Sequence, residues 1–442
     1  MHKIITVGLI FVLISHFSVH AQTGSFFSTD AELSNSLINS IYQDSRNYIW
    51  IATEDGLNKY DGVRFTIYRN KKNDAATLKN NYVRTVYEDS KGRIWVGCIN
   101  GLLVYDRSLD RFTEIPIYFR KQLIEPHITS IVELSSGELV VATSGGGVIR
   151  PAKDYRSFLV DEGLFPQLSS RYLMDIHQDK TGNIWIASEN QGLNCVLKST
   201  GEILTFKAPA TIGSNQISAI AEDKNGVIYV GTLTGGLFKY LPGEKRFKSI
   251  PYRNASIVLP VKSLLYDEVK DQLLVGTDGR GLMYYDQRLQ QLTEYEMLSA
   301  VFDFSRTKVH ALHQDKTGNL WVGLFQKGVF IAPNHPNKFQ YWGAKSFYNN
   351  VIGSNCVMSV LKDGDGRLWV GTDNDGVYAV DRSRSSHHYE MKTSFNGVSG
   401  TIMSMVEGDA ATLWMASFLD GLIRFDKRNG SLQYLKNELR GK

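Results

Sequence analysis

The sequence predicts an all-β fold: a seven-bladed β-propeller of four-stranded blades, followed by two blades of an incomplete second propeller. The first observation behind this prediction is a repeat. Nine times along the 442 residues, a bulky central residue stands two positions before a small one, at intervals of 44 to 48 residues. Four-stranded propeller blades repeat at about this period. The nine pairs are Trp50/Ala52, Trp95/Gly97, Val140/Ala142, Trp185/Ala187, Tyr229/Gly231, Leu274/Gly276, Trp321/Gly323, Trp369/Gly371 and Trp414/Ala416.

The second observation is that one repeat divides into four short strands. In the second copy, residues 83–88 predict a first strand, 93–98 a second and 101–105 a third, and Phe112 lies on a short fourth. Residues 89–92, Asp-Ser-Lys-Gly, predict a tight turn, because Asp bonds to nearby backbone and Gly accepts a positive φ. Four such strands with their turns account for one blade.

The third observation is that certain positions keep their chemistry in every copy. A Gly followed by Leu or Val stands six or seven positions after the central residue, and an apolar residue stands about twelve positions before it. The small residue after the centre predicts that the backbone or an aromatic ring of a neighbouring blade lies against it. Strands that are apolar on both faces are typical of sheets that are covered on both sides.

Residues 1–21 predict a secretory signal peptide. Lys3 precedes an apolar run from Ile4 to Ile14, and a small-x-small cleavage site follows at residues 19–21. An uncleaved anchor is the alternative, although the run is short for a membrane span. No second run of spanning length follows, so we expect an exported soluble chain, located in the periplasm.

Seven copies are expected to close one ring in residues 22–343, with residues 337–342 completing the seventh blade. Residues 344–442 hold the last two copies, which we interpret as the opening blades of a second, truncated propeller. A single unusual assembly of nine blades is the alternative. Two unpaired blades would expose a blade flank.

Charge and cysteine content exclude several functions. The net charge is +4, and it falls to +3 when Lys3 is removed with the signal. This charge, without a stripe of Lys and Arg, does not predict nucleic-acid binding. Cys98, Cys195 and Cys356 are odd in number and lie at unlike positions of the repeat, so a disulfide framework is not expected.

The strings DSRNYIWIATEDGLNKYD, DSKGRIWVGCINGLLVYD and DGDGRLWVGTDNDGVYAVD resemble two-component regulator propeller repeats. The resemblance covers residues 35–434. It implies the exported sensor region of a hybrid two-component system of polysaccharide-degrading bacteria, with an oligosaccharide or polyuronide fragment as its signal. Sensors of that family carry two seven-bladed propellers, an immunoglobulin-like domain, a membrane helix and a kinase core. This chain departs from that pattern because it ends at Lys442 without a kinase sequence.

Residues that suggest other chemistry have simpler interpretations. His177 and His313 occupy a position that is Tyr in other copies, which favours packing between blades. Cys98 occupies a position that is Thr or Ser in most copies, so it is interpreted as a buried small residue. Residues 363–366 and 373–376 are acid-rich, but they lack the Glu of a calcium loop and are interpreted as turns. No catalytic residue, metal site or cofactor is predicted.

The positions that vary between copies predict the binding site. The start of the first strand and the loop between the second and third strands differ in every blade, and in propellers both reach the mouth of the central channel. Amide, cationic and aromatic side chains there suit a saccharide. The candidate ligand-binding residues are Arg84, His127, Arg171, Tyr172, Asn190, Lys262, Arg280 and His310.

These observations predict a non-enzymatic, ligand-binding sensor module that recognises an oligosaccharide or another small ligand. Ligand would bias the arrangement of sensor chains, in a homodimer or with a partner chain. A protein-interaction scaffold is the alternative. A polysaccharide lyase or glycosidase is a further one, although a glycosidase needs two nearby carboxylates and none is evident. His127, Arg171, Tyr172 and His310 are the residues from which a lyase site would be built.

Overall fold

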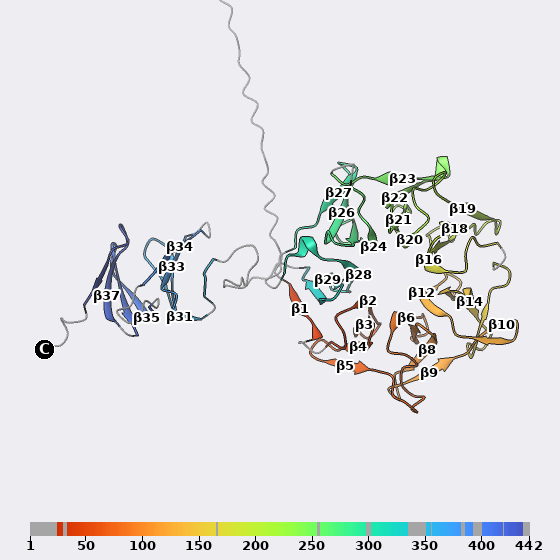
Figure 1. Cartoon of the computed structure of the whole chain (residues 1–442), viewed down its shortest axis with the longest axis horizontal. Helices are drawn as coiled ribbons and strands as arrows, with labels where there is room; N and C mark the ends of the chain where they lie inside the picture. The colour runs from red at the N-terminus through yellow and green to blue at the C-terminus, as the bar shows by residue number, and fades with distance from the viewer. Residues whose placement is uncertain are drawn as a thin grey trace, which may run out of the picture.

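The protein is all-β, as the repeat predicts, and most of its sheets form a ring (Figure 1). The computed structural model describes residues 24–29, 33–164, 167–253, 257–297, 302–334, 351–354, 356–381, 385–391, 400–418 and 420–435. Seven sheets surround a central axis, and the first strands of successive sheets lie beside one another, β28 beside β2 included. Two further four-stranded sheets follow in the chain.

Most sheets of the ring are built from four consecutive antiparallel strands; the third has six strands with one parallel pair, and the seventh takes its outer strand from the N-terminus. The first two sheets are β2 (Ile38–Gln43), β3 (Ile49–Thr53), β4 (Gly56–Tyr60) and β5 (Phe65–Tyr68), then β6 (Val83–Glu88), β7 (Ile94–Cys98), β8 (Gly101–Asp106) and β9 (Arg111–Ile115). The third has six strands: β10 (Ile117–Phe119), β11 (Gln122–Ile124), β12 (His127–Glu133), β13 (Leu139–Ser144), β14 (Gly147–Pro151) and β15 (Phe158–Val160). The fourth comprises β16 (Leu173–Gln178), β17 (Ile184–Ser188), β18 (Leu193–Val196) and β19 (Ile203–Phe206).

The remaining elements follow the same order. The fifth sheet is β20 (Ile217–Glu222), β21 (Ile228–Thr232), β22 (Gly236–Leu241) and β23 (Arg246–Ile250), with the 3₁₀ helix η2 (Pro242–Glu244). The sixth is β24 (Val261–Asp267), β25 (Gln272–Thr277), β26 (Leu282–Asp286) and β27 (Gln291–Glu294). After η3 (Phe304–Arg306), the seventh contains β28 (Val309–Gln314), β29 (Leu320–Leu324), β30 (Gly328–Ala332) and β1 (Ser25–Phe27). The last two sheets are β31 (Val357–Lys362), β32 (Leu368–Thr372), β33 (Val377–Val380) and β34 (Ser386–Tyr389), then β35 (Ile402–Asp409), β36 (Thr412–Ser417), β37 (Gly421–Asp426) and β38 (Leu432–Tyr434).

The core of the ring lies between adjacent blades. The second strands are buried almost completely, and β7 is buried along its whole length. At Gly97, an added Cβ would stand 2.6 Å from Cγ2 of Ile128, which begins the next blade. Gly231 meets Val261, and Gly323 meets Ile38, in the same way. The close approach is therefore as predicted: the neighbour is a β-branched residue, through its side chain at these three positions and also through its backbone carbonyl at Gly276, and not an aromatic ring.

The seventh blade is completed by the N-terminal strand. β1 pairs antiparallel with β30, with Phe27 opposite Val329. The prediction that residues 337–342 complete this blade is therefore wrong, because β1 already occupies the outer edge of the sheet; residues 337–342 themselves lie outside the described part. Between blades one and seven, Gln43 Oε1 accepts a hydrogen bond from the N–H of Lys316 at 2.7 Å. These contacts close the ring.

The last two sheets pack against each other through the same kind of contact. Gly371 lies against Ile402, whose side chain is buried. Val357 holds the corresponding position at the start of β31, yet it is 43% exposed, whereas its counterparts in the ring are 0–1% exposed. The first flank of this pair of blades is therefore an open apolar surface.

Two predictions about the chain's organisation fall outside the described residues: the signal peptide at 1–21 and the boundary at 343/344. In the described part, no helix is long and apolar enough to cross a membrane. All three cysteines are free, and Cys98 and Cys195 are buried. Burial raises the pKa of the Cys98 thiol to about 12, which fits the small buried residue that was predicted.

Candidate functional site

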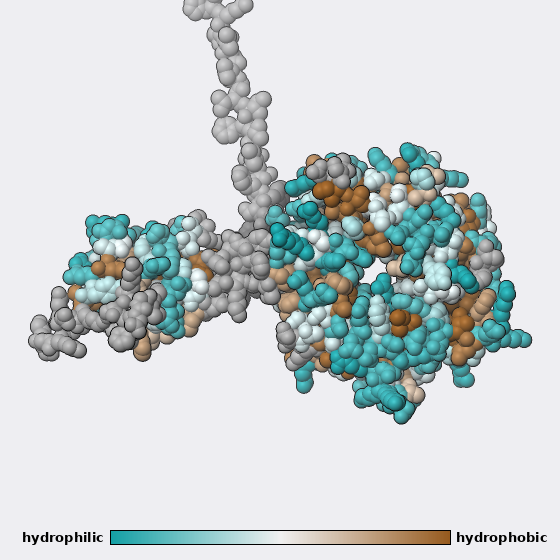
Figure 2. Space-filling view, viewed as in Figure 1, coloured by the Kyte–Doolittle hydropathy of each residue, from teal (hydrophilic) through white to brown (hydrophobic). Residues whose placement is uncertain are grey.

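In each blade of the ring, the first strand is the one nearest the central channel (Figure 1), and it begins with a β-bulge. In each blade of the ring the register between the first and second strands shifts by one residue, which leaves one residue without a pairing partner. Figure 2 shows the channel open through the centre of the ring. The variable residues of the sequence analysis are these bulged residues: Asn39, Arg84, Thr129, Met174, Ser218, Lys262 and His310.

Backbone hydrogen bonds hold the loops between the second and third strands at the mouth of the channel. The carbonyl of Lys308, just before β28, accepts the N–H of Phe325 at 2.9 Å, and the carbonyl of Pro260 accepts the N–H of Asp278 at 2.9 Å. The carbonyl of Tyr82 accepts the N–H of Ile99 in the same way. Each loop between a second and a third strand is thereby held beside the start of a first strand, on one face of the ring.

Two lysines and one carboxylate meet on one side of the mouth. Asp278 receives Lys308 Nζ at 2.8 Å and Lys262 Nζ at 3.7 Å. Burial would raise the pKa of Asp278, but the hydrogen bond from Lys308 and the charge of Lys262 outweigh burial and lower it. Within the described part of the chain, the Arg84 guanidinium makes neither a hydrogen bond nor an ion pair.

Two histidines at the mouth are held neutral. Burial, followed by the charge of Lys262, lowers the pKa of His310 to about 4. Burial, followed by the charge of Arg84, lowers the pKa of His127 to about 4. The charge of Arg84 also contributes to the lowered pKa of His310, after burial and the charge of Lys262.

Aromatic rings accompany both histidines. The ring centroids of His310 and Phe325 are 4.9 Å apart, and those of His127 and Tyr82 are 5.8 Å apart. Lys308 Nζ lies 5.4 Å from the centroid of Phe325. His127 Nε2 is buried and has no hydrogen-bond partner among the described residues. The mouth thus combines charge, neutral polar atoms and ring faces.

The other predicted site residues lie apart from this cluster or face solvent. Tyr172 is 55% exposed, and the carbonyl of Arg171 accepts the N–H groups of Gly145 and Gly147. Asn190 is exposed and accepts a hydrogen bond from Gln216 at 3.3 Å. The charge of Arg280 acts on Tyr252, which forms a bridge with Leu292 at the outer edge of blade six. Of the eight predicted residues, Lys262 and His310 lie in the neighbouring blades six and seven, as do Asp278 and Lys308, and Arg84 and His127 lie in the neighbouring blades two and three.

Sequence reasoning missed two residues at the mouth, Lys308 and Tyr82, and did not include Asp278 among the candidate ligand-binding residues. Lys308 and Tyr82 precede the first strand, at the position that is His127 in the third blade and Tyr172 in the fourth. Because that position varies between blades, the sequence could have indicated Lys308 and Tyr82 as residues of the channel mouth. The sequence could not indicate that Asp278 pairs with Lys308, because the two residues belong to different blades.

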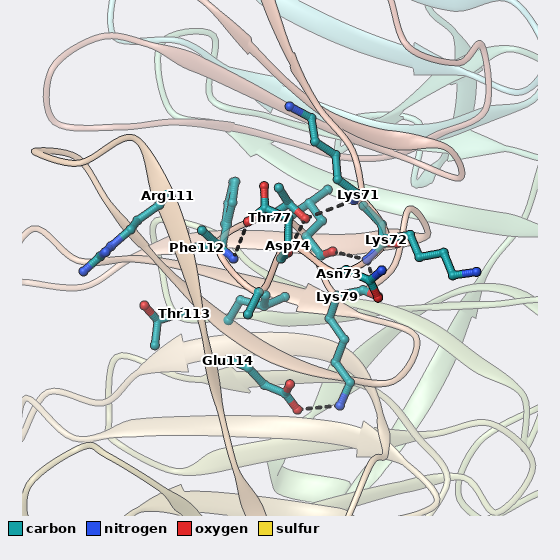
Figure 3. Close-up of a pocket in the computed structure, with 15 residues that line it drawn as sticks. Lys71, Lys72, Asn73, Asp74, Thr77, Lys79, Arg111, Phe112, Thr113 and Glu114 are labelled. Carbon is teal, nitrogen blue, oxygen red and sulfur yellow. Dashed lines mark hydrogen bonds and ion pairs between the residues drawn. The ribbon is translucent and has the colours of Figure 1, made fainter.

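A cavity of about 750 Å³ on the outer part of blades one and two is a rival site (Figure 3). Its loop, residues 70–79, is held by hydrogen bonds such as Phe112 N–H to the Ala76 carbonyl at 2.8 Å. Lys71, Lys72 and Arg111 extend away from one another, and Lys79 is paired with Glu114 at 2.5 Å. These side chains do not converge on one point, so the channel mouth is the better candidate. In the described part, no three or more His, Cys, Asp or Glu side chains are arranged to hold a metal ion.

Comparison with known proteins identifies the repeats. The family model for the two component regulator propeller matches residues 32–55, 77–100, 211–234 and 352–374. These segments are two-component regulator propeller repeats. A relative, histidine kinase P4 of Formosa agariphila, is 37% identical over 78 residues, which are 16% of this chain and 6% of that kinase.

Solved structures of extracellular domains of hybrid two component systems share the fold. The extracellular domain of one hybrid two component system from B. thetaiotaomicron matches with a TM-score of 0.61 at 20% identity, over 93% of this chain and 60% of that one. A second such domain from the same organism matches with a TM-score of 0.57 at 18% identity, over 92% of this chain and 59% of that one. This chain thus spans about 60% of the length of the solved domains.

The propeller is also shared with enzymes. A streptogramin B lyase matches with a TM-score of 0.52 at 13% identity, over 70% of this chain and 95% of the lyase. At this identity the likeness concerns the fold, which does not decide between binding and catalysis.

Proposed function

We propose that this chain is a ligand-binding sensor module of a hybrid two-component system, that it acts in the periplasm and that it recognises an oligosaccharide. The regulator propeller repeats and the similarity to extracellular domains of hybrid two component systems support the sensor assignment. The single observation that carries ligand binding is the mouth of the channel, where the bulged residues and fixed loops of several blades meet.

Signal transfer would follow from a shift between arrangements of sensor chains. A ligand can change such an equilibrium only by its difference in affinity for the two arrangements. The mouth is formed by residues of several blades, so a ligand bound there contacts blades that are far apart in sequence. The kinase that would receive the signal, the partner chain and the dimer all belong to this proposal.

Two alternatives remain distinct from the sensor. A scaffold is favoured by the open apolar flank of β31, where Val357 and Val360 are exposed. A lyase is favoured by the neutral His127 and His310, since a neutral imidazole can act as a general base.

The test is the thermal midpoint of residues 22–442 against a panel of oligosaccharides and uronates. A ligand that binds the folded state raises the midpoint according to its concentration relative to its dissociation constant. A sensor is expected to be stabilised by one class of saccharide that is recovered unchanged. Turnover of the saccharide would instead establish the enzyme, and a flat panel from a well-folded protein would favour the scaffold.

A further inference from the structure

The third blade carries an extra hairpin at the outer rim of the ring (Figure 1). Strands β10 and β11 extend its sheet to six strands, and β11 is the outermost of them. In the described part of the chain, no strand pairs with the outer edge of β11. An uncovered edge strand presents backbone N–H and C=O groups that can pair with a strand of another chain.

The hairpin turn determines which backbone groups of β11 point outward. Arg120 and Lys121 form a two-residue turn in which both have a positive φ, 48° and 69°, as a type I′ turn requires. Phe119 and Gln122 flank this turn and are paired, and in such a hairpin the flanking pair exchanges both hydrogen bonds. Hydrogen-bonded and open pairs alternate along antiparallel strands, so the N–H and C=O of Leu123 point away from β10.

Exposed apolar side chains accompany this free edge. Leu123 lies opposite Tyr118, which in turn lies beside Leu159 on β15. Leu123 is 59% exposed and Leu159 is 48% exposed. The position of Leu159 is Thr113 in the second blade and Lys248 in the fifth, and both of these are exposed. Where those two blades present polar or charged side chains, the third blade presents a row of apolar ones.

The sequence of this edge is complementary to itself. If two copies of β11 pair antiparallel about Leu123, the two Leu123 residues exchange both of their backbone hydrogen bonds. The same register places Lys121 of each copy opposite Glu125 of the other, because these residues stand two positions to either side of Leu123. Both side chains are exposed, and Glu125 uses one carboxylate oxygen for Lys79 at 2.9 Å. A register shifted by two residues places a charged residue opposite Leu123 and loses the paired charges.

We propose that this edge is the contact of a symmetric dimer, in which β11 pairs with β11 of a second copy of this chain. The two six-stranded sheets then form one continuous sheet across a twofold axis. The inference rests on the proposed function for its purpose, since a sensor that acts through the arrangement of its chains needs a contact between them. The surface itself follows from β11 and its neighbours, so its test needs no saccharide.

The experiment is sedimentation equilibrium of residues 22–442 without saccharide, over a range of protein concentrations. A reversible equilibrium between monomer and dimer is expected. Leu123→Lys should raise the dissociation constant about tenfold or more, because it places two positive charges side by side at the centre of the contact. Leu109→Lys is the matched control: Leu109 is 56% exposed in the turn after β8, and its substitution should change the constant by less than about twofold.

Exchange of the two flanking charges tests the register. Lys121→Glu and Glu125→Lys should each raise the dissociation constant about fivefold, because each places like charges opposite one another. The variant with both substitutions restores opposite charges across the axis and should return the constant to within about twofold of the parent. Lys79 keeps its second partner, Glu114, in these variants. Thermal midpoints show that each variant is folded, and a role in folding alone would not be reversed by the second substitution.

The possible failures are distinguishable. A protein that stays monomeric at every concentration overturns the dimer and leaves ligand binding by the sensor untouched. A dimer whose dissociation constant is unchanged by Leu123→Lys and by both single charge variants overturns the β11 contact and points to another surface, such as the open flank at Val357. Failure of every saccharide to stabilise the protein would contradict the proposed function while leaving a β11 dimer in place.

Discussion

At the scale of single residues, one Asp in each of five blades both forms a turn and accepts a hydrogen bond from the central Trp. Asp179 accepts the N–H of Thr181 and of Asn183, and its second oxygen accepts the indole N–H of Trp185 at 2.8 Å. Burial would raise the pKa of Asp179, but the hydrogen bonds from Thr181, Trp185 and Asn183 outweigh burial and lower it. The same arrangement recurs at Asp44/Trp50, Asp89/Trp95, Asp315/Trp321 and Asp363/Trp369.

The sequence predicted these turns but not the bond to the indole. An Asp followed by Gly indicates a turn because that turn is formed by neighbouring residues. The bond from Trp185 to Asp179 depends on how the indole packs between two blades. The acid-rich segment 363–366 obeys the same rule, since Asp363 accepts the N–H of Arg367 and the indole of Trp369, which agrees with its interpretation as a turn.

Asp179→Ala is expected to lower the free energy of unfolding by about 2–3 kcal/mol, because it leaves a buried indole N–H and turn N–H groups without their charged acceptor. Denaturant unfolding of the variant and the parent measures the difference. Asp154→Ala, in an exposed turn, serves as the control and should change the free energy by less than about 0.5 kcal/mol. Equal effects of the two substitutions would contradict a special role for Asp179.

At the scale of elements, each blade packs against an apolar side chain from the next blade. The small residue after each central position receives the first apolar side chain of the next blade, as at Gly97 and Ile128. The sequence predicted a close neighbour here from the absence of large residues. It could not name that neighbour, because the two positions are joined only when consecutive sheets pack face to face.

Gly97→Ala should destabilise the protein by about 1–3 kcal/mol, since the added methyl group would overlap Ile128 and Thr85. The thermal midpoint measures the effect. Gly243→Ala adds the same group where nothing lies within 4 Å, so its midpoint should stay near that of the parent. Equal thermal midpoints for Gly97→Ala and Gly243→Ala would contradict this prediction, because they would mean that the interface between blades accommodates the added methyl group without loss of stability.

At the scale of the whole molecule, the ring is closed by residues from both ends of its sequence. Phe27 on β1 pairs with Val329 of blade seven, and its ring contacts Tyr60 and Phe65 of blade one at centroid distances of 5.4 and 5.2 Å. One aromatic side chain therefore joins the first and last blades. No such closing contact exists in the described part of the last two sheets, where the flank at Val357 is exposed.

Phe27→Ala should lower the free energy of unfolding by about 2–3 kcal/mol, because it removes packing from two blades at once. Unfolding followed by tryptophan fluorescence reports the loss, since Trp50 and Trp321 lie in blades one and seven. Leu123→Ala, at a residue that is 59% exposed, is the matched control and should have little effect. If the two variants unfold alike, β1 does not close the ring.

The sequence by itself determined the all-β fold, the position of the blades and their turns, because each blade is a local unit whose strands and turns follow one another within a single repeat. It also indicated which positions vary at the channel mouth. Only the tertiary structure decided that β1 completes blade seven and that Phe27 packs against Tyr60 and Phe65 of blade one. Both depend on ring closure, which joins residues from opposite ends of the propeller and leaves no signal within any one repeat.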